Sequence, residues 1–93
     1  MRFKVVYHPD VIRIDLPKIN RNIQKRIKKA IQERLGVDPV SYSDPLRQTL
    51  HGYMRMRVGD YRVVFRAREP NIIAIIVISH RKEVYQMAAK RLN

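Results

Sequence analysis

The sequence contains no cysteine and no long apolar run. The absence of cysteine excludes disulfide bonds and cysteine-based zinc sites, and it is compatible with a reducing cytosol. The apolar run Ile72–Ile78 has only seven residues, whereas a membrane-spanning helix needs about 20. Residues 1–7 alternate between polar and apolar types and lack the apolar core of a signal peptide. We therefore expect a cytoplasmic protein.

Acidic residues are also scarce, because 8 Asp and Glu stand against 20 Lys and Arg, for a formal charge of +12. Hydrophobic residues make up 45% of the chain, which excludes a disordered basic tail and predicts one folded domain over residues 1–93. Such an excess of one sign favours a polyanionic partner, most often a nucleic acid. A membrane surface is disfavoured, because the charges are spread along the chain instead of clustering beside an apolar anchor.

The spacing of apolar residues predicts the element order β-α-α-β-β-β-α, without repeats or linkers. The expected elements are a strand at 2–7, a helix at 10–16 capped by Asp10, a helix from Pro17 to Leu35 that Gly36 ends, strands at 53–58, 61–68 and 72–79, and a helix at 83–92. We expect an α+β fold: an antiparallel sheet of about four strands, with the helices packed on one face.

Gly59-Asp60 predicts a two-residue hairpin turn that sets the register of the strands on either side. Val58 would then face Tyr61, and Arg57 would face Arg62. One face of the hairpin would carry Tyr53, Arg55, Arg57, Arg62, Arg66 and Arg68, and the other Met54, Met56, Val58, Val63, Phe65 and Ala67. Like charges directly opposite each other destabilise a sheet, so the pair predicts a phosphate bound between two guanidinium groups. The alternative is a solvated basic strand face.

Two segments, Gly52–Phe65 (GYMRMRVGDYRVVF) and Ile78–Tyr85 (ISHRKEVY), resemble the hairpin and the closing motif of the RelE/ParE toxin superfamily. With the N-terminal strand and helices, the resemblance covers nearly the whole chain. It implies the toxin of a type II toxin–antitoxin system. RelE-like members cleave mRNA in the ribosomal A site, whereas ParE-like members inhibit DNA gyrase and lack the nuclease residues. The dense arginine set favours the RelE-like branch, and the closing segment argues against a third possibility, a non-toxic RNA-binding domain.

The resemblance also implies the site residues, which are Arg55, Arg57, Arg62, Arg81 and Tyr85. In RelE-like nucleases a ribose 2′-OH attacks the neighbouring phosphate without a metal or cofactor, and clustered cations stabilise the charge that develops. The best-studied branch has lysines in the first hairpin strand, where this chain has arginines that cannot readily lose a proton. Either another group takes the 2′-OH proton, with His80 as the candidate general base, or catalysis rests on electrostatics. The alternative role of His80 is to cap the last helix, and the alternative for Tyr85 is packing.

The remaining charged residues have simpler interpretations. His8 and His51 have no partner at metal-binding spacing, and Asp60 is a turn residue. The run of Lys25, Arg26, Lys28 and Lys29 is a solvated helix face or, as the alternative, a contact to ribosomal RNA. The expected partners are the ribosome, mRNA and an acidic antitoxin with an amphipathic helix that masks or displaces the basic face.

Overall fold

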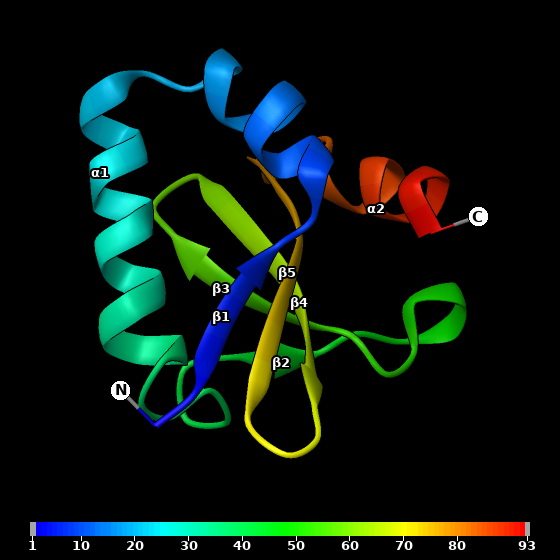
Figure 1. The fold of residues 1–93 in the computed structure, drawn as a ribbon. Coiled ribbons are helices and arrows are strands. Elements are labelled where there is room, and N and C mark those ends of the chain that lie inside the picture. The colour runs from blue at the N-terminus through cyan, green and yellow to red at the C-terminus, as the bar shows by residue number, and fades with distance from the viewer. Residues whose placement is uncertain (1, 93) are drawn as a thin grey trace.

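The computed structural model describes residues 2–92 and contains a five-stranded sheet with the strand order β1-β5-β4-β3-β2 (Figure 1). Residues 1 and 93, the ends of the predicted domain, lie outside the described residues. The strands are β1 (Lys4–Tyr7), β2 (Asp44–Pro45), β3 (Met54–Val58), β4 (Tyr61–Arg68) and β5 (Ile72–His80). The α+β fold of the RelE type is thus confirmed.

Helices occupy both the N-terminal half and the C-terminus. They are η1 (Val11–Asp15), η2 (Leu16–Lys18), α1 (Arg21–Ala30), η3 (Ile31–Leu35), η4 (Gln48–Leu50) and α2 (Val84–Leu92). Helix α1 passes directly into η3 and ends at Gly36, as predicted. The predicted start of this helix, at Pro17, was wrong. Pro17 lies within η2, and the cap of α1 is Asn20, whose side chain accepts a hydrogen bond from the backbone of Asn22.

The prediction of a purely antiparallel sheet was also wrong. Strand β1 runs parallel to β5, with Lys4 beside Ile72 and Tyr7 beside Ile75, while the other pairs of strands are antiparallel. An alternating pattern shows which side chains share a face but not which way the strand runs. The direction of β1 follows only from its pairing with β5 in the folded chain.

The two faces of the sheet carry different cores, because helices cover both of them, contrary to expectation (Figure 1). On one face, α1, η1 and η3 enclose the larger cluster, in which Ile27, Ile31 and Phe65 are fully buried. On the opposite face, α2 covers a smaller cluster around Val64 and Val77. Strand β5 lies between β1 and β4, which explains why it is apolar on both sides.

A buried ion pair forms hydrogen bonds with the backbone of β5 where this strand extends beyond the end of β1. The Asp15 carboxylate accepts a hydrogen bond from the backbone N–H of Ile78 at 3.0 Å, and Arg91 donates to the carbonyl of Ile76 at 3.0 Å. Arg91 also binds Asp15 through two nitrogens, at 2.8 and 3.0 Å. This contact raises the pKa of the Arg91 guanidinium, and burial opposes the shift. The pair therefore fastens α2 to η1 across the sheet edge.

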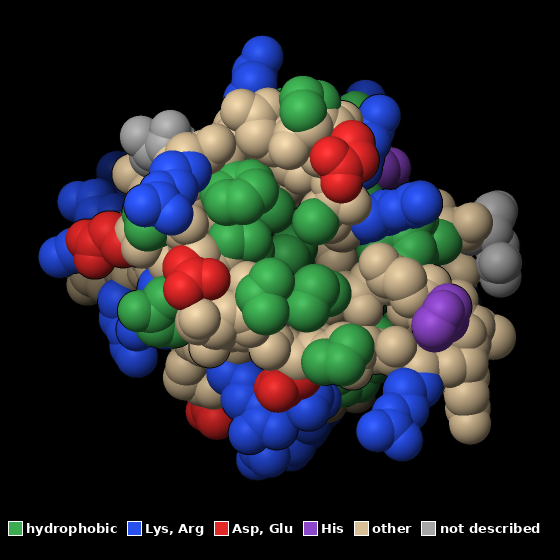
Figure 2. Space-filling view, turned by 90° about the horizontal axis from the view of Figure 1, so that it is seen from below, with side chains coloured by type: hydrophobic (Ala, Val, Ile, Leu, Met, Phe, Trp, Pro, Cys, Tyr) green, Lys and Arg blue, Asp and Glu red, His purple; other side chains and the backbone are tan. Residues whose placement is uncertain are grey.

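The end of the molecule that contains the loop after η3 is largely apolar at its centre and charged at its rim (Figure 2). In this loop Val37, Val40 and Tyr42 are exposed by 43%, 74% and 50%. The guanidinium of Arg34 lies 5.9 Å from the ring centre of Tyr42. Among the described residues, no helix is long and apolar enough to cross a membrane.

Candidate active site

The β3–β4 hairpin presents its arginines in rows on the face that α2 partly covers. At the turn end, Arg57 lies opposite Arg62, and Arg62 in turn lies beside Ser79 of β5. One row further from the turn, Arg55 lies opposite Val64, which belongs to the cluster under α2. The predicted register is therefore confirmed in this region. The sheet brings the two opposed arginines to its end and places Arg55 under the edge of α2.

Arg55 and Tyr85 are in direct contact. An Arg55 Nη donates a hydrogen bond of 2.6 Å to the Tyr85 hydroxyl, and the guanidinium carbon lies 5.9 Å from the ring centre. The Arg55 Nε is buried without a hydrogen-bond partner, and its nearest carboxylate oxygen, on Asp44 of β2, is 3.7 Å away. The hydrogen bond to Tyr85 is the main cause that raises the pKa of Arg55. Arg55 is therefore a permanent cation that orients the phenol.

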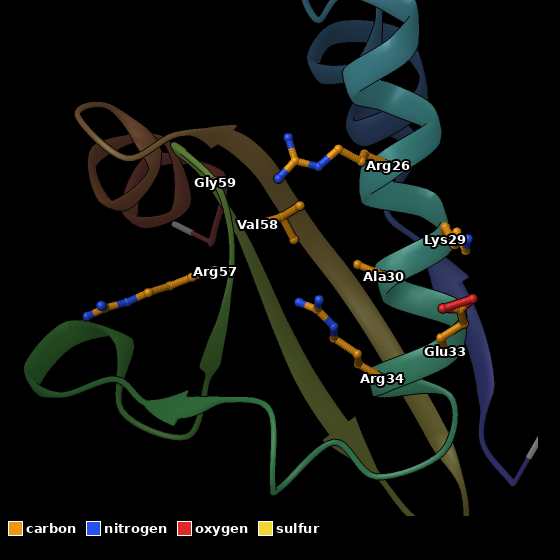
Figure 3. A pocket seen from close by; sticks show the side chains of 8 residues that line it. All are labelled: Arg26, Lys29, Ala30, Glu33, Arg34, Arg57, Val58 and Gly59. Carbon is orange, nitrogen blue, oxygen red and sulfur yellow. The ribbon is translucent and has the colours of Figure 1, made fainter.

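Arg57 and Arg62 differ in how much of each side chain is already engaged. An Arg62 Nη donates to two carbonyls of the turn, those of Gly59 and Tyr61, each at 2.9 Å. Arg57 is exposed and forms no ion pair among the described residues. Its side chain points away from α1 and toward the η4 loop (Figure 3). Arg57 is thus free to bind an anion, while Arg62 offers its remaining donors from a position fixed by the turn.

Arg81 and His80 lie apart from the contact between Arg55 and Tyr85. The backbone N–H of Arg81 donates to the Asp60 carbonyl at 2.8 Å, and its side chain is exposed, with Nε 3.7 Å from the Asp60 carboxylate. His80 pairs with Tyr61, and the two rings meet edge to face at 5.8 Å. Tyr61 packs on the α1 core, so His80 lies on the face opposite Arg57. The structure does not bring His80 to the arginines.

His80 holds the turn before α2, but it does not cap the helix itself, which begins at Val84. The Nδ1 of His80 accepts a hydrogen bond of 3.2 Å from the backbone N–H of Lys82, in the turn that leads into α2. Arg66 is also separate from the group at the turn end, because its guanidinium lies 5.6 Å from the ring centre of Tyr53. The arginine face therefore divides into a stacked pair at one end and the cluster Arg55, Arg57, Arg62 and Tyr85 at the other.

Two adjoining cavities open beside this cluster. One, of about 510 Å³, lies along the edge of β3 and is lined by Arg47, Arg55 and Arg57. The other, of about 460 Å³, lies between the η4 loop and α2 and is lined by the η4 residues together with Arg55, Tyr85 and Gln86. Arg47 and Arg55 line both. Positive charge is therefore concentrated along one continuous depression that ends at Tyr85.

A third cavity, of about 260 Å³, lies on the other side of β3, between that strand and α1 (Figure 3). Arg26 and Arg34 point into it from the helix, and the Arg26 guanidinium approaches the turn at Gly59. Lys29 and Glu33 also line it. Lys25 and Lys28 are exposed on α1 but do not line this cavity. Of the predicted basic run, Arg26 and Lys29 thus form one wall of a cationic groove.

Sequence reasoning missed Arg47 and Asp44, which flank Arg55 in space. Asp44 belongs to the two-residue strand β2 and Arg47 follows it, in a Pro-containing segment without periodicity, so no pattern in the sequence indicated their position. Among residues 2–92, no group of three His, Asp or Glu residues lies close enough together to hold a metal ion.

Comparisons with known proteins agree with this architecture. The family model described as the ParE toxin of type II toxin–antitoxin systems (parDE) matches residues 5–85, and the chain belongs to this family. Together with the structural relatives, this match confirms the resemblance to the RelE/ParE superfamily. The curated proteins include no match to this chain.

Several of the structural relatives are toxin–antitoxin complexes. The RelBE2 complex from Mycobacterium tuberculosis has a TM-score of 0.80 and 26% identity, over 87% of this chain and 100% of that chain. The RelB–RelE complex from Methanococcus jannaschii has a TM-score of 0.63 and 26% identity, over 88% of this chain and 96% of that chain. The YoeB–YefM complex from Staphylococcus aureus shares the fold. It has a TM-score of 0.60 and 20% identity, over 86% of this chain and 98% of that chain.

Proposed function

We propose that this type II toxin is a metal-independent endoribonuclease that cleaves mRNA in the A site of the ribosome. The observation that carries the proposal is the 2.6 Å hydrogen bond from Arg55 to Tyr85, next to the opposed pair Arg57 and Arg62. A binding surface alone has no need of a phenol held by a cation at the end of an arginine-lined depression. RelE-like members of the superfamily work through such a set of cations and a tyrosine.

The chemistry follows from the donors in this depression. Arg57 and Arg62 bind the non-bridging oxygens of the scissile phosphate and stabilise their charge as the 2′-oxygen attacks and gives up its proton to a water molecule, since His80 lies on the other face. The bond from phosphorus to the 5′-oxygen then breaks and leaves a 2′,3′-cyclic phosphate. The Tyr85 hydroxyl accepts its hydrogen bond from Arg55, so its own proton is directed elsewhere. It serves as the donor to the departing 5′-oxygen. Arg81 approaches the same phosphate from the rim of the turn.

Ribosomal RNA is the proposed ligand of the groove between α1 and β3. Arg26 and Arg34 enter this groove without an ion pair among residues 2–92, and Lys29 extends the positive charge along the helix. Phosphates of a folded RNA suit this site better than exposed bases do, because the groove has charged walls and no aromatic platform.

The proposed protein partner is an antitoxin. The relatives from M. tuberculosis and M. jannaschii were solved with theirs. The net charge of +12 and the uncovered arginines favour an acidic segment with an amphipathic helix that masks or displaces the basic face. Its gene is expected beside the toxin gene. Growth inhibition by this chain alone, relieved by co-expression of that neighbour, is the expected result.

The decisive experiment for the enzymatic function is a translation extract with one defined mRNA. The wild-type protein should cut the mRNA in the codon that occupies the A site. Arg62→Ala should nearly abolish cutting and change the melting temperature little, because relief of like-charge repulsion across the hairpin opposes the loss of the two hydrogen bonds that Arg62 donates to the turn. An mRNA with 2′-deoxyribose at the cut position should resist cleavage. A variant that keeps the wild-type rate, or cleavage that survives the deoxy substitution, would contradict the proposed chemistry.

A second candidate function is inhibition of DNA gyrase without chemistry, as in ParE-like members of the superfamily. The match to the ParE family model over residues 5–85 is the observation that favours it. A supercoiling assay separates the two candidates. If the wild-type protein inhibits gyrase and leaves mRNA on the ribosome intact, the second function is correct and the nuclease function is not.

A further inference from the structure

One cavity of the toxin differs in composition from the phosphate-binding surfaces around it. It lies between the η4 loop and α2, has a volume of about 460 Å³, and falls in the size range of small-ligand sites, about 300–1,000 Å³. Leu46 and Leu50 supply apolar walls, Tyr85 an aromatic ring and Arg55 a guanidinium plane. Its remaining lining includes Gln48, Thr49 and Gln86, which are exposed. Single-stranded RNA bases are bound by this combination of stacking planes and hydrogen-bonding side chains.

The cavity also offers hydrogen-bonding capacity that the toxin itself does not use. Within residues 2–92 the side chains of Gln48, Thr49 and Gln86 form no hydrogen bond with the protein. Arg55 has a buried Nε without a partner. A glutamine amide carries both a donor and an acceptor, which is the arrangement that reads the edge of a base.

The backbone of the η4 loop is strained at the cavity wall. Gln48 has a φ of 55°, in the left-handed region that side chains other than glycine rarely adopt. Strain of this kind persists where the surrounding structure holds it, often at binding sites. Here it sets the side of the loop from which the Gln48 side chain leaves the backbone, beside the depression that holds Arg55 and Arg57.

We infer that this cavity binds one base of the mRNA next to the scissile phosphate, and that Gln48 and Gln86 select which base is accepted. The inference rests on the proposed nuclease function for its biological role, but not for the binding itself. The base stacks beside Tyr85 while its ribose–phosphate backbone continues into the arginine-lined depression. Substrate preference and catalysis are therefore carried by different residues. Arg57 and Arg62 act on the phosphate that every nucleotide has, and the two glutamines act on the base.

Two substitutions remove the reading groups with little effect on the fold. Gln48→Gly deletes the amide at a position whose positive φ favours glycine, so the loop keeps its conformation. Gln86→Ala truncates an exposed residue of α2. Gln32→Ala, at an exposed position of η3 on the other face of the sheet, is the matched control. Cut sites are mapped across a pool of mRNAs in the translation extract. Both cavity variants should cut about tenfold more slowly at the favoured base and at nearly the wild-type rate at the other bases, so that the preference at one position falls by about tenfold.

Nucleotide binding to the full-length protein tests the cavity independently of cleavage. The probes are the four ribonucleoside 5′-monophosphates and inorganic phosphate, with the backbone amide resonances of Thr49, Leu50 and Gln86 as the readout. We expect shifts that depend on the base, that are absent with phosphate and that are lost in Gln48→Gly. Equal shifts with inorganic phosphate, or an unchanged preference in both variants, would overturn the inference while the nuclease stands. Intact mRNA together with base-dependent shifts would overturn the proposed nuclease function but support base binding in the cavity.

Discussion

The two faces of the sheet are built from the same three central strands, yet they are held together in different ways. The α1 face is a continuous apolar core around Ile27, Ile31 and Phe65. The α2 face has a small cluster around Val64 and Val77, and polar contacts complete it: the ion pair of Arg91 with Asp15, and the hydrogen bond of Arg55 with Tyr85. The first face supplies stability, and the second holds the candidate site.

The difference teaches how a small domain can carry like charges at close range. Apolar burial contributes about 25 cal/mol per Å², so the larger core supplies most of the stability and tolerates repulsion on the opposite face. The arginines of β3 and β4 are held in fixed positions because the apolar core on the α1 face packs against the opposite side of these strands. The following predictions test that division, from the largest expected effect to the smallest.

The largest effect is expected from a pair of neighbouring residues on β4 that point to opposite faces. Phe65→Ala should lower the free energy of unfolding by about 3–5 kcal/mol, because it opens a cavity in the larger core. Val64→Ala, under α2, removes two methyl-sized groups and should cost about 2 kcal/mol. Urea unfolding of both variants measures the difference. Equal losses would show that the two faces contribute equally.

Loss of the buried ion pair should release α2. Arg91→Ala leaves the Asp15 carboxylate buried without its partner, and breaking such a pair costs about 3–5 kcal/mol. Amide hydrogen exchange should accelerate over residues 84–92 before it changes in β4, because α2 rests on the smaller cluster. Cleavage should fall as well, since Tyr85 moves with the helix. Lys90→Ala, at the exposed neighbouring position, is the control. An unchanged rate of amide hydrogen exchange in α2 would show that Arg91 does not hold this helix in place.

The two ends of the arginine face should differ in their effect on catalysis. Arg57→Ala should lower the cleavage rate by about 10²–10³, the range found when one donor to a developing oxyanion is removed. Arg66→Ala should have little effect, because this guanidinium stacks on Tyr53 away from the turn. Both variants should melt close to the wild-type temperature. Single-turnover rates on programmed ribosomes make the comparison. Similar rate losses in the two variants would mean that the whole face acts as a general basic surface.

The smallest effect concerns the salt dependence of ribosome binding. Affinity should fall steeply with salt, because counterions are released when phosphates are neutralised. Arg26→Ala, in the groove beside α1, should reduce the slope of log affinity against log salt by about 1 and leave the cleavage rate of bound mRNA unchanged. An affinity that barely changes with salt would exclude phosphate contacts as the main source of binding.

Much of the hairpin could be predicted from local chemistry. Gly59, with a φ of 59°, permits the tight turn, and the turn then sets which residues face each other. The buried positions of the helix that ends at Leu35 also followed from their spacing. The helix start did not, because Pro17 and Asn20 both satisfy local rules for a first turn and only the packing of η2 distinguishes them.

The site was predicted in composition but only partly in arrangement. The resemblance named Arg55 and Tyr85, and the structure joins them by a hydrogen bond. His80 was the expected substitute for the lysines that the chain lacks, but its side chain shares a face with Tyr61 because the two residues are paired across β4 and β5. A short motif at the end of a strand cannot show this, since a shift of one residue moves a side chain to the other face.

By itself, the sequence determined the basic charge, the hairpin register and the identity of the arginines, because each depends on composition or on residues close together in the chain. Only the tertiary structure decided that α2 covers the face opposite α1, that Asp15 meets Arg91 and that the η4 loop forms a cavity with Tyr85. These contacts join residues far apart in the chain. Their partners are chosen by packing and by the need of buried polar groups for hydrogen bonds, which no local pattern records.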